Sequence, residues 1–395
     1  MAAVPWGKRP RTKASRNAQP CSSGLPPLYE EDPSSFRHWS YAHTPAHYTN
    51  HRGQSLEPAT HALASLALSQ TRLNRVSRLA TPMLLVSGLA ADLDWLSYLG
   101  GPRLFLAAHR TATHSLLGTV VIACGAAVLF SQLARPHSPA TRRATQFFRA
   151  LIVCFAGAVV HLLLDLSTSY GVKLLWPFSG KWYAWDFAPS LDPVVLFLLL
   201  AAILLPRLFG LVTQEISGRS KVHSGGGGTT AVLLLVLLYF GGRAVAHQNA
   251  LALLNARVYR GEAPLRSAAF PASSPLNWTG LVETPDAIDE VQVPLSGAFD
   301  PEAARPHFKP ADSPALESAR RSPAAQAFLG FARFPFATQE ETPSGYRIEI
   351  RDLRFAAAPP ADHLGEVVVI VTVSPQTQVI ANQLQFAAAT PPPSR

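Results

Sequence analysis

Two side chains one helical turn apart are the first candidates for chemistry. The run from His161 to Asp165 (HLLLD) places an imidazole and a carboxylate four residues apart inside a long apolar stretch. On a helix this spacing puts both side chains on one face, where they can hold one cation together. A buried histidine that only hydrogen-bonds to its neighbour explains the pair equally well. Ionisable groups at membrane depth are costly, so the pair carries a functional hypothesis.

Three more segments bring histidine or aspartate to the ends of apolar stretches. They are THALASLAL at 60–68, AADLD at 90–94 and HRTATHS at 109–115. Each alone has an ordinary explanation, since aspartates can end a membrane helix in water and Thr113 can cap the helix after it. A shared centre explains all four segments together. The predicted metal ligands are His61, Asp92, Asp94, His109, His114, His161 and Asp165.

The ligand types restrict the metal. Mixed nitrogen and oxygen donors without sulfur suit a divalent ion such as Zn²⁺, Mn²⁺, Fe²⁺ or Mg²⁺. The three cysteines form no CxxC pair, so they support neither a thiolate zinc site nor a disulfide framework. A bound metal would lower the pKa of a water molecule and polarise the scissile group. We assign proton transfer to Asp94, as an aspartate left free of the metal, and stabilisation of a developing negative charge to Arg110.

The elements that would position these side chains are apolar helices. A bilayer core takes about 20 residues to cross, and four runs predict spanning helices: 115–134, 148–166, 193–212 and the shorter 230–246. Two further runs, 61–73 and 79–89, are too short to cross and predict a membrane-embedded helical hairpin. The predicted fold is an α-helical integral membrane bundle of about four spans plus this hairpin.

The two ends of the chain differ from this central part. Residues 1–58 lack an apolar core and are rich in Pro, Ser, Arg and Lys, which predicts disorder and no cleavable signal peptide. The predicted membrane domain covers 59–250. From 257 to 395, the runs YRIEI and VVVIVTV between Pro, Ala and Asp turns predict a β-rich soluble domain. The net charge of +9 is dispersed, so no nucleic-acid partner is expected.

Basic residues are unevenly distributed between the predicted connections. The connections 72–78, 135–149 and 207–221 hold several arginines and lysines, whereas the opposite connections hold few. Cytoplasmic loops carry the excess of positive charge, so the first set is predicted to be cytoplasmic. The metal centre and the C-terminal domain then lie on the outer side. The basic N-terminal segment argues the other way.

The order of the motifs resembles that of a known family. THA, AADLD, HRTATHS, and HLLLD followed by TSYGVKLLWPF are similar to the pattern of the YdjM-like metal-dependent hydrolases, an inner-membrane-associated family also described as LexA-binding. The similarity covers about residues 58–195. The chain departs from the pattern at Ala91, where proline is usual, and at Ala112, near a usual glycine, and neither is a predicted ligand. The resemblance implies a multi-pass protein of the bacterial inner membrane with a metal site.

The favoured function is metal-dependent hydrolysis of a membrane-embedded or amphiphilic substrate, with lipid phosphoesters as one class. Two alternatives stay open. A non-catalytic membrane protein would saturate the metal with its own ligands to hold helices together, whereas a catalytic metal keeps a position open. An ion- or proton-coupled transporter would use the same residues as a relay, but no inverted repeat is evident. The aromatic run Leu175–Phe178 fits either an interfacial belt or a site entrance.

The predicted topology is testable by cysteine accessibility. Single cysteines in place of Ser138 and Ser344 should react with an impermeant maleimide from opposite sides of the membrane, because the positive-inside rule puts the first in the cytoplasm and the second outside. Intact cells and inverted vesicles provide the comparison. Labelling of both positions from the same side would refute the arrangement.

Overall fold

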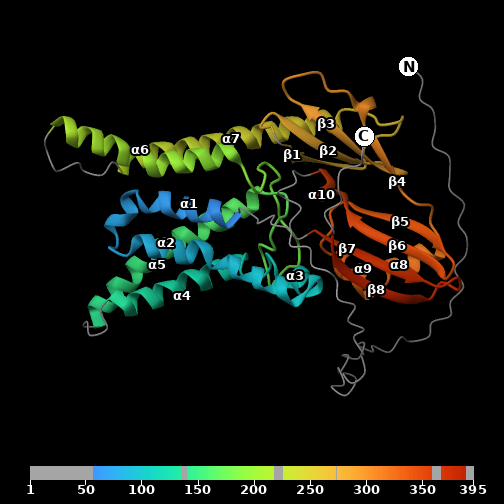
Figure 1. Ribbon diagram of the computed structural model, residues 1–395, viewed down its shortest axis with the longest axis horizontal. Coiled ribbons are helices and arrows are strands. Elements are labelled where there is room, and N and C mark those ends of the chain that lie inside the picture. The colour runs from blue at the N-terminus through green and yellow to red at the C-terminus, as the bar shows by residue number, and fades with distance from the viewer. Residues whose placement is uncertain (1–56, 135–139, 218–225, 273, 358–365, 388–395) are drawn as a thin grey trace, which may run out of the picture. The chain divides into compact units, whose positions relative to one another are not determined.

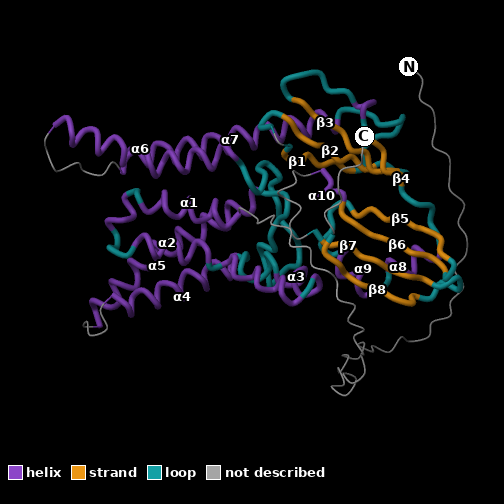
Figure 2. Tube along the Cα trace, viewed as in Figure 1, coloured by secondary structure: helices purple, strands orange, loops and turns teal. Residues whose placement is uncertain are grey.

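The computed structural model describes residues 57–134, 140–217, 226–272, 274–357 and 366–387 (Figure 1). They form a helical part followed by a C-terminal part of two antiparallel β-sheets, which Figure 2 distinguishes by colour. The predicted combination of membrane helices with a β-rich C-terminal part is confirmed. The segment 1–58, predicted to be disordered, lies outside the described residues except for its last two, which begin the first helix.

The first two helices form the short hairpin expected from the sequence. α1 (Glu57–Ser69) and α2 (Ala80–Leu89) are joined through the 3-10 turn η2 (Arg72–Arg75). Helices of 13 and 10 residues measure roughly 20 Å and 15 Å, less than the thickness of a bilayer core. Neither helix is therefore long enough to cross alone. The chain continues through the 3-10 helix η3 (Ala91–Gly100) and α3 (Pro102–Ala108).

Four long helices complete the helical part. They are α4 (Leu116–Ala134), α5 (Ala140–Ser167), α6 (Pro193–Ser217) and α7 (Gly226–Asn255). Within the described ranges, three stretches are long and apolar enough to span a membrane: 116–133, 144–167 and 226–255. The apolar stretch of α6, Pro193–Phe209, is shorter, so its span stays a prediction. α7 exceeds the predicted run 230–246 because its last turns continue onto the first β-sheet.

Small residues bring α5 and α2 close together. A Cβ atom on Gly157 of α5 would lie 2.5 Å from Ser87 Oγ and 2.9 Å from Leu84 O of α2. A Cβ atom on Gly88 would lie 2.3 Å from Ser65 Oγ of α1. At Gly157 the added atom would meet the backbone of α2, so glycine permits the close approach of the two helices there. Close packing of small residues is a usual way for membrane helices to associate, and here it brings the Gly88 carbonyl to α5.

The C-terminal part contains two four-stranded antiparallel sheets whose strands follow the chain order. The first sheet consists of β1 (Arg266–Pro271), β2 (Asn277–Glu283), β3 (Ala287–Pro294) and β4 (Arg305–Phe308). The second consists of β5 (Pro335–Thr342), β6 (Gly345–Asp352), β7 (Val367–Val373) and β8 (Val379–Phe386). Short helices intervene: η4 (Pro301–Ala303), α8 (Pro314–Arg320), α9 (Pro323–Leu329) and α10 (Leu353–Ala357). The two predicted runs fall in β6 and β7.

Both sheets share hydrophobic cores with the helical part. Leu254 of α7 packs with Trp278 and Val282 of the first sheet. Phe105 and Leu106 of α3 pack with residues of α8, α9 and the second sheet. The second sheet is therefore attached to the segment that carries the aspartates and histidines of the predicted site.

Overpacking at Gly157 tests the close approach of α2 and α5. Gly157→Leu should lower the free energy of unfolding by about 1–3 kcal/mol, because the new side chain meets backbone that cannot move aside. Gly125 of α4 is the matched control, since nothing lies within 4 Å of a Cβ added there. Thermal unfolding in detergent should show a clear drop for Gly157→Leu and little change for Gly125→Leu. Equal melting temperatures would contradict the packing.

Candidate metal centre

The Asp165 carboxylate, at the end of α5, is the point on which the predicted ligands converge. Its side chain is only 1 % exposed. Oδ2 lies 3.1 Å from His161 Nε2 and 2.9 Å from His114 Nε2. Oδ1 lies 3.3 Å from His61 Nε2. The helical spacing of His161 and Asp165 thus does place both side chains at one centre.

The hydrogen bonds of two histidines fix which nitrogen faces the centre. His161 Nδ1 lies 2.8 Å from the Gly88 carbonyl oxygen, and a carbonyl can only accept, so Nδ1 carries the proton. His114 Nδ1 lies 3.1 Å from Asp94 Oδ2, which is likewise an acceptor. The two Nε2 atoms face each other at 3.1 Å. With neutral imidazoles, two lone pairs and a carboxylate oxygen then meet without a hydrogen between them, an arrangement that a cation or an added proton stabilises.

His61 and Asp92 extend this centre on its other sides. Asp92 Oδ1 lies 3.6 Å from His161 Nε2 and 3.9 Å from His114 Nε2. Asp92 Oδ2 is buried and has no hydrogen-bond partner among the described residues. One ligand atom each from His61, Asp92, His161 and Asp165 lies within 4.8 Å of the others. These are separations that donors around one ion can adopt after small side-chain adjustments.

Asp94 and His109 lie one layer further out than the sequence analysis expects. Asp94 accepts hydrogen bonds from the Arg110 backbone N–H at 2.8 Å and the Thr113 hydroxyl at 2.9 Å. His109 Nδ1 lies 2.9 Å from Asp94 Oδ1. Both Asp94 oxygens thus bind groups of the HRTATHS loop, among them the imidazoles of His109 and His114. In this geometry Asp94 orients His114, and His109 supports Asp94. Because both Asp94 oxygens already accept hydrogen bonds from the loop, they do not face the centre.

Arg110 contacts the centre through Asp165. Its guanidinium group lies 3.0 Å from Asp165 Oδ1 and donates to the Thr168 hydroxyl at 2.9 Å. It also stacks over the Tyr170 ring, with 5.1 Å to the ring centroid. The side chain is 2 % exposed, so the ion pair is fully desolvated. The guanidinium therefore neutralises a buried carboxylate, whereas the sequence analysis placed it beside a reacting group.

The charges of the cluster do not balance. Asp92, Asp94 and Asp165 carry three negative charges when ionised, and Arg110 supplies one positive charge. With neutral histidines two negative charges remain, which matches one divalent cation. Burying such a net charge without a counter-charge is strongly unfavourable.

Burial and neighbours shift the pKa of four cluster groups outside the spanning helices. Burial raises the pKa of Asp92. Burial also acts to raise the pKa of Asp94, but hydrogen bonds from His109 and His114 outweigh it and hold the pKa well below its ordinary value. Burial lowers the pKa of His109. For His114, the Asp165 and Asp94 carboxylates outweigh burial and raise the pKa to about 9. A proton on His114 and a bound metal would thus be alternative counter-charges, because a metal ligand must be unprotonated.

The loop that presents His109 to His114 is held by backbone hydrogen bonds. Lys173 N–H donates to the Arg110 carbonyl at 3.0 Å, and Leu116 N–H donates to the Leu174 carbonyl at 2.9 Å. Arg110 has a φ of 53°, a left-handed conformation that these contacts stabilise. Ser115 caps α4, since its hydroxyl accepts from Gly118 N–H at 2.9 Å. The proposed Thr113 cap is wrong, because that hydroxyl is used by Asp94.

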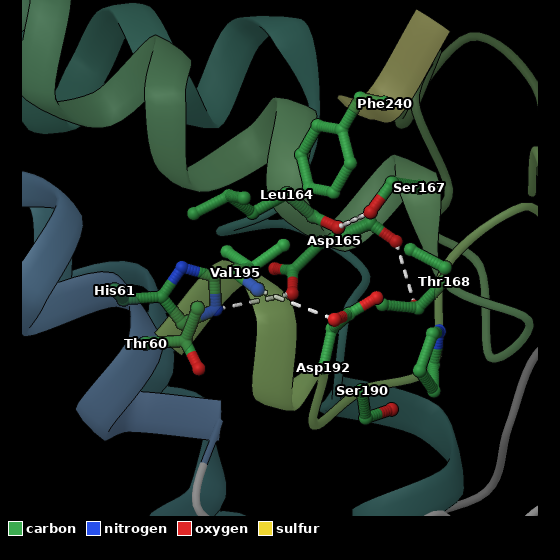
Figure 3. A pocket seen from close by; sticks show the side chains of 12 residues that line it. Thr60, His61, Leu164, Asp165, Ser167, Thr168, Ser190, Asp192, Val195 and Phe240 are labelled. Carbon is green, nitrogen blue, oxygen red and sulfur yellow. Dashed lines mark hydrogen bonds and ion pairs between the residues drawn. The ribbon is translucent and has the colours of Figure 1, made fainter. Parts of the chain in front are cut away.

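A small pocket opens on the His61 side of the centre (Figure 3). Its volume is roughly 20 Å³, enough for one water molecule by the usual measure. Thr60, Asp165 and Thr168 contribute to its lining. The Thr60 hydroxyl is buried and has no hydrogen-bond partner among the described residues, so a water in the pocket would satisfy it. A water-sized group can thus approach the cluster at His61 and Asp165.

Arg354, in the C-terminal part, supports the site and was not found by the sequence analysis. Its guanidinium group donates to the carbonyls of Ser169 and Tyr170, each at 3.0 Å. It lies 3.1 Å from Asp352 Oδ2 and is 2 % exposed. Tyr170 in turn stacks with Arg110. A lone arginine in a β-rich segment carries no motif, so only the tertiary structure could reveal this contact.

Comparison with known proteins gives the family of the helical part. Residues 56–250 match the sequence model of a family described as YdjM inner membrane protein. This part of the chain belongs to the YdjM family. The matched range contains every predicted ligand and ends before the first β-strand. Searches of curated proteins and of solved structures found no match for the chain. The family supports a location in the inner membrane, as the sequence predicts.

Removing Arg354 tests the connection between the second sheet and the site. Arg354→Met should cost about 3–5 kcal/mol, the usual effect of leaving a buried charge partner unpaired. The exposed Arg347, on β6, is the matched control. Thermal unfolding in detergent should separate Arg354→Met from Arg347→Met and the unchanged protein. If the Arg354→Met protein is as stable as the Arg347→Met control, Arg354 does not support the loop after α5.

Proposed function

We propose that this YdjM-family chain is a membrane-bound metal-dependent hydrolase that acts on an amphiphilic substrate of the bilayer. The observation that carries the proposal is the convergence of His114 Nε2, His161 Nε2 and Asp165 Oδ2, separated by 2.9–3.1 Å, with no hydrogen assigned between them. Each imidazole is oriented from behind, by Asp94 or the Gly88 carbonyl. Outer hydrogen bonds of this kind are typical of metal-binding histidines.

We assign the ion to His114, His161 and Asp165, with His61 and Asp92 facing its remaining positions. Two imidazoles and a carboxylate suit Zn²⁺, Mn²⁺ or Fe²⁺ better than Mg²⁺, which prefers oxygen ligands. Three protein ligands with an open position are the usual composition of a catalytic zinc site. The pocket on the His61 side supports an open position. A purely structural site would fill it with protein atoms.

The residues around the ion have separate tasks in this proposal. A bound metal would supply an activated water and polarise the scissile bond. Asp92 accepts the proton of the water, since its Oδ2 has no other hydrogen-bond partner among the described residues. Arg110 keeps Asp165 ionised and in place through the pair with Oδ1. A phosphoester at the membrane surface suits a centre at the end of a spanning helix.

Metal analysis tests the ligand assignment. His161→Ala and Asp165→Asn should each remove most of the bound metal from detergent-purified protein, because each deletes a direct ligand. His307→Ala is the control, since His307 pairs with Glu290 in the first sheet. Elemental analysis should find metal in the unchanged protein and the control only. Full metal content in His161→Ala would remove the site from consideration.

Asp92 separates catalysis from metal storage. Asp92→Asn should retain metal but lower the hydrolysis rate by about a hundredfold or more, the usual contribution of a general base. The substrates are phosphoester lipids in mixed micelles, tested with the metal-loaded protein. Retained turnover in Asp92→Asn would exclude it as the base. If the loaded, unchanged protein cleaves none of these lipids, the hydrolase proposal fails in favour of a structural metal site.

A further inference from the structure

The 3-10 helix η3 carries an exposed apolar stripe. A 3-10 helix has about three residues per turn, so residues three apart lie in one row. Leu93, Leu96 and Leu99 form such a row and are 64 %, 66 % and 84 % exposed. Three leucines in one exposed row form an apolar surface that water alone covers poorly.

The other rows of η3 are committed to the protein, so the stripe cannot turn inward. Asp92 faces the metal centre, and Asp94 pairs with the HRTATHS loop behind it. Trp95 packs on Phe105 with ring centroids 5.3 Å apart, and Tyr98 stacks on Phe386 at 4.2 Å. The rotation of η3 is therefore fixed by contacts on both remaining rows.

The stripe continues an exposed apolar surface of the candidate spanning helix α4. The contact of Asp92 with His114 places η3 beside the first turn of α4, where Leu116 and Leu117 are exposed. The Leu116–Leu174 hydrogen bond brings a second apolar segment to the same turn, in which Phe178 is 90 % exposed. The 3-10 helix η3 contacts both α3 and α4. No residue from 95 to 102 is charged.

We propose that the leucine stripe of η3 inserts into the boundary between the lipid headgroups and the acyl chains, so that the occupant of this surface is the phospholipid bilayer. Amphipathic helices with one apolar face lie in this way at the membrane interface. The insertion fixes the metal centre at the depth of the headgroups. Entry of substrate from the bilayer follows from this depth and rests on the proposed function.

Depth-dependent quenching tests the insertion in the full chain. Cys21, Cys124 and Cys154 are replaced by alanine, and a single cysteine at Leu96, Leu117 or Ser344 carries an environment-sensitive fluorophore. The protein is reconstituted in phosphatidylcholine vesicles with lipids brominated along the acyl chain. We expect strong quenching at Leu96 and at the α4 position Leu117, and none at Ser344 in the β5–β6 turn. Aqueous iodide should show the reverse order.

The outcome does not depend on metal or hydrolysis. If iodide quenches the label at Leu96 and brominated lipid does not, the insertion is overturned. The same result is expected if the stripe instead binds a soluble partner. The substrate route has its own test. The triple variant Leu93→Ser, Leu96→Ser, Leu99→Ser should raise KM for a vesicle-embedded phosphoester without changing kcat on a water-soluble analogue. An equal loss of activity on both substrates would exclude the entry route. The insertion itself would then be judged by the quenching experiment alone.

Discussion

The buried Asp165 carboxylate is the interaction on which the rest of the helical part depends. A negative charge with 1 % exposure at the end of a membrane helix is tolerable only when other groups replace its hydration. Arg110 supplies a positive charge, and His61, His114 and His161 surround the oxygens. These groups come from α1, the HRTATHS loop and α5 itself. The requirement to neutralise one carboxylate therefore brings together segments far apart in the chain.

The negative charge that Arg110 leaves uncompensated makes the cluster a binding site for a positive charge. A proton on His114 or a divalent cation would each compensate part of the negative charge of the carboxylates. Asp94 and the Gly88 carbonyl hold the imidazoles of His114 and His161 with their Nε2 atoms toward Asp165. Such preorganisation reduces the reorganisation needed when an ion binds.

The C-terminal part contributes to the site although the family match ends before it. Arg354 fixes the backbone that follows α5, and Asp186 receives both guanidinium nitrogens of Arg333 at 2.6 and 2.7 Å. Asp186 has a φ of 58°, a conformation rarely adopted by residues other than glycine, which this pair helps to stabilise. Residues that flank β5 and β6 therefore support the loop between α5 and α6.

The sequence by itself determined the classes of element and the membership of the cluster. Apolar length predicted the membrane helices and the short hairpin, alternation predicted β6 and β7, and the cost of ionisable groups in a membrane selected the histidines and aspartates. Each of these signals is local, because hydrophobicity and spacing are properties of neighbouring residues. The distinction between Asp92 at the centre and Asp94 behind it is not local. Both lie in AADLD, and only the packing of η3 against the HRTATHS loop decided that Asp92 faces the Nε2 atoms of His114 and His161 while Asp94 pairs with Nδ1 of His109 and His114. The role of Arg354 likewise required tertiary structure, since its partners lie about 185 residues away.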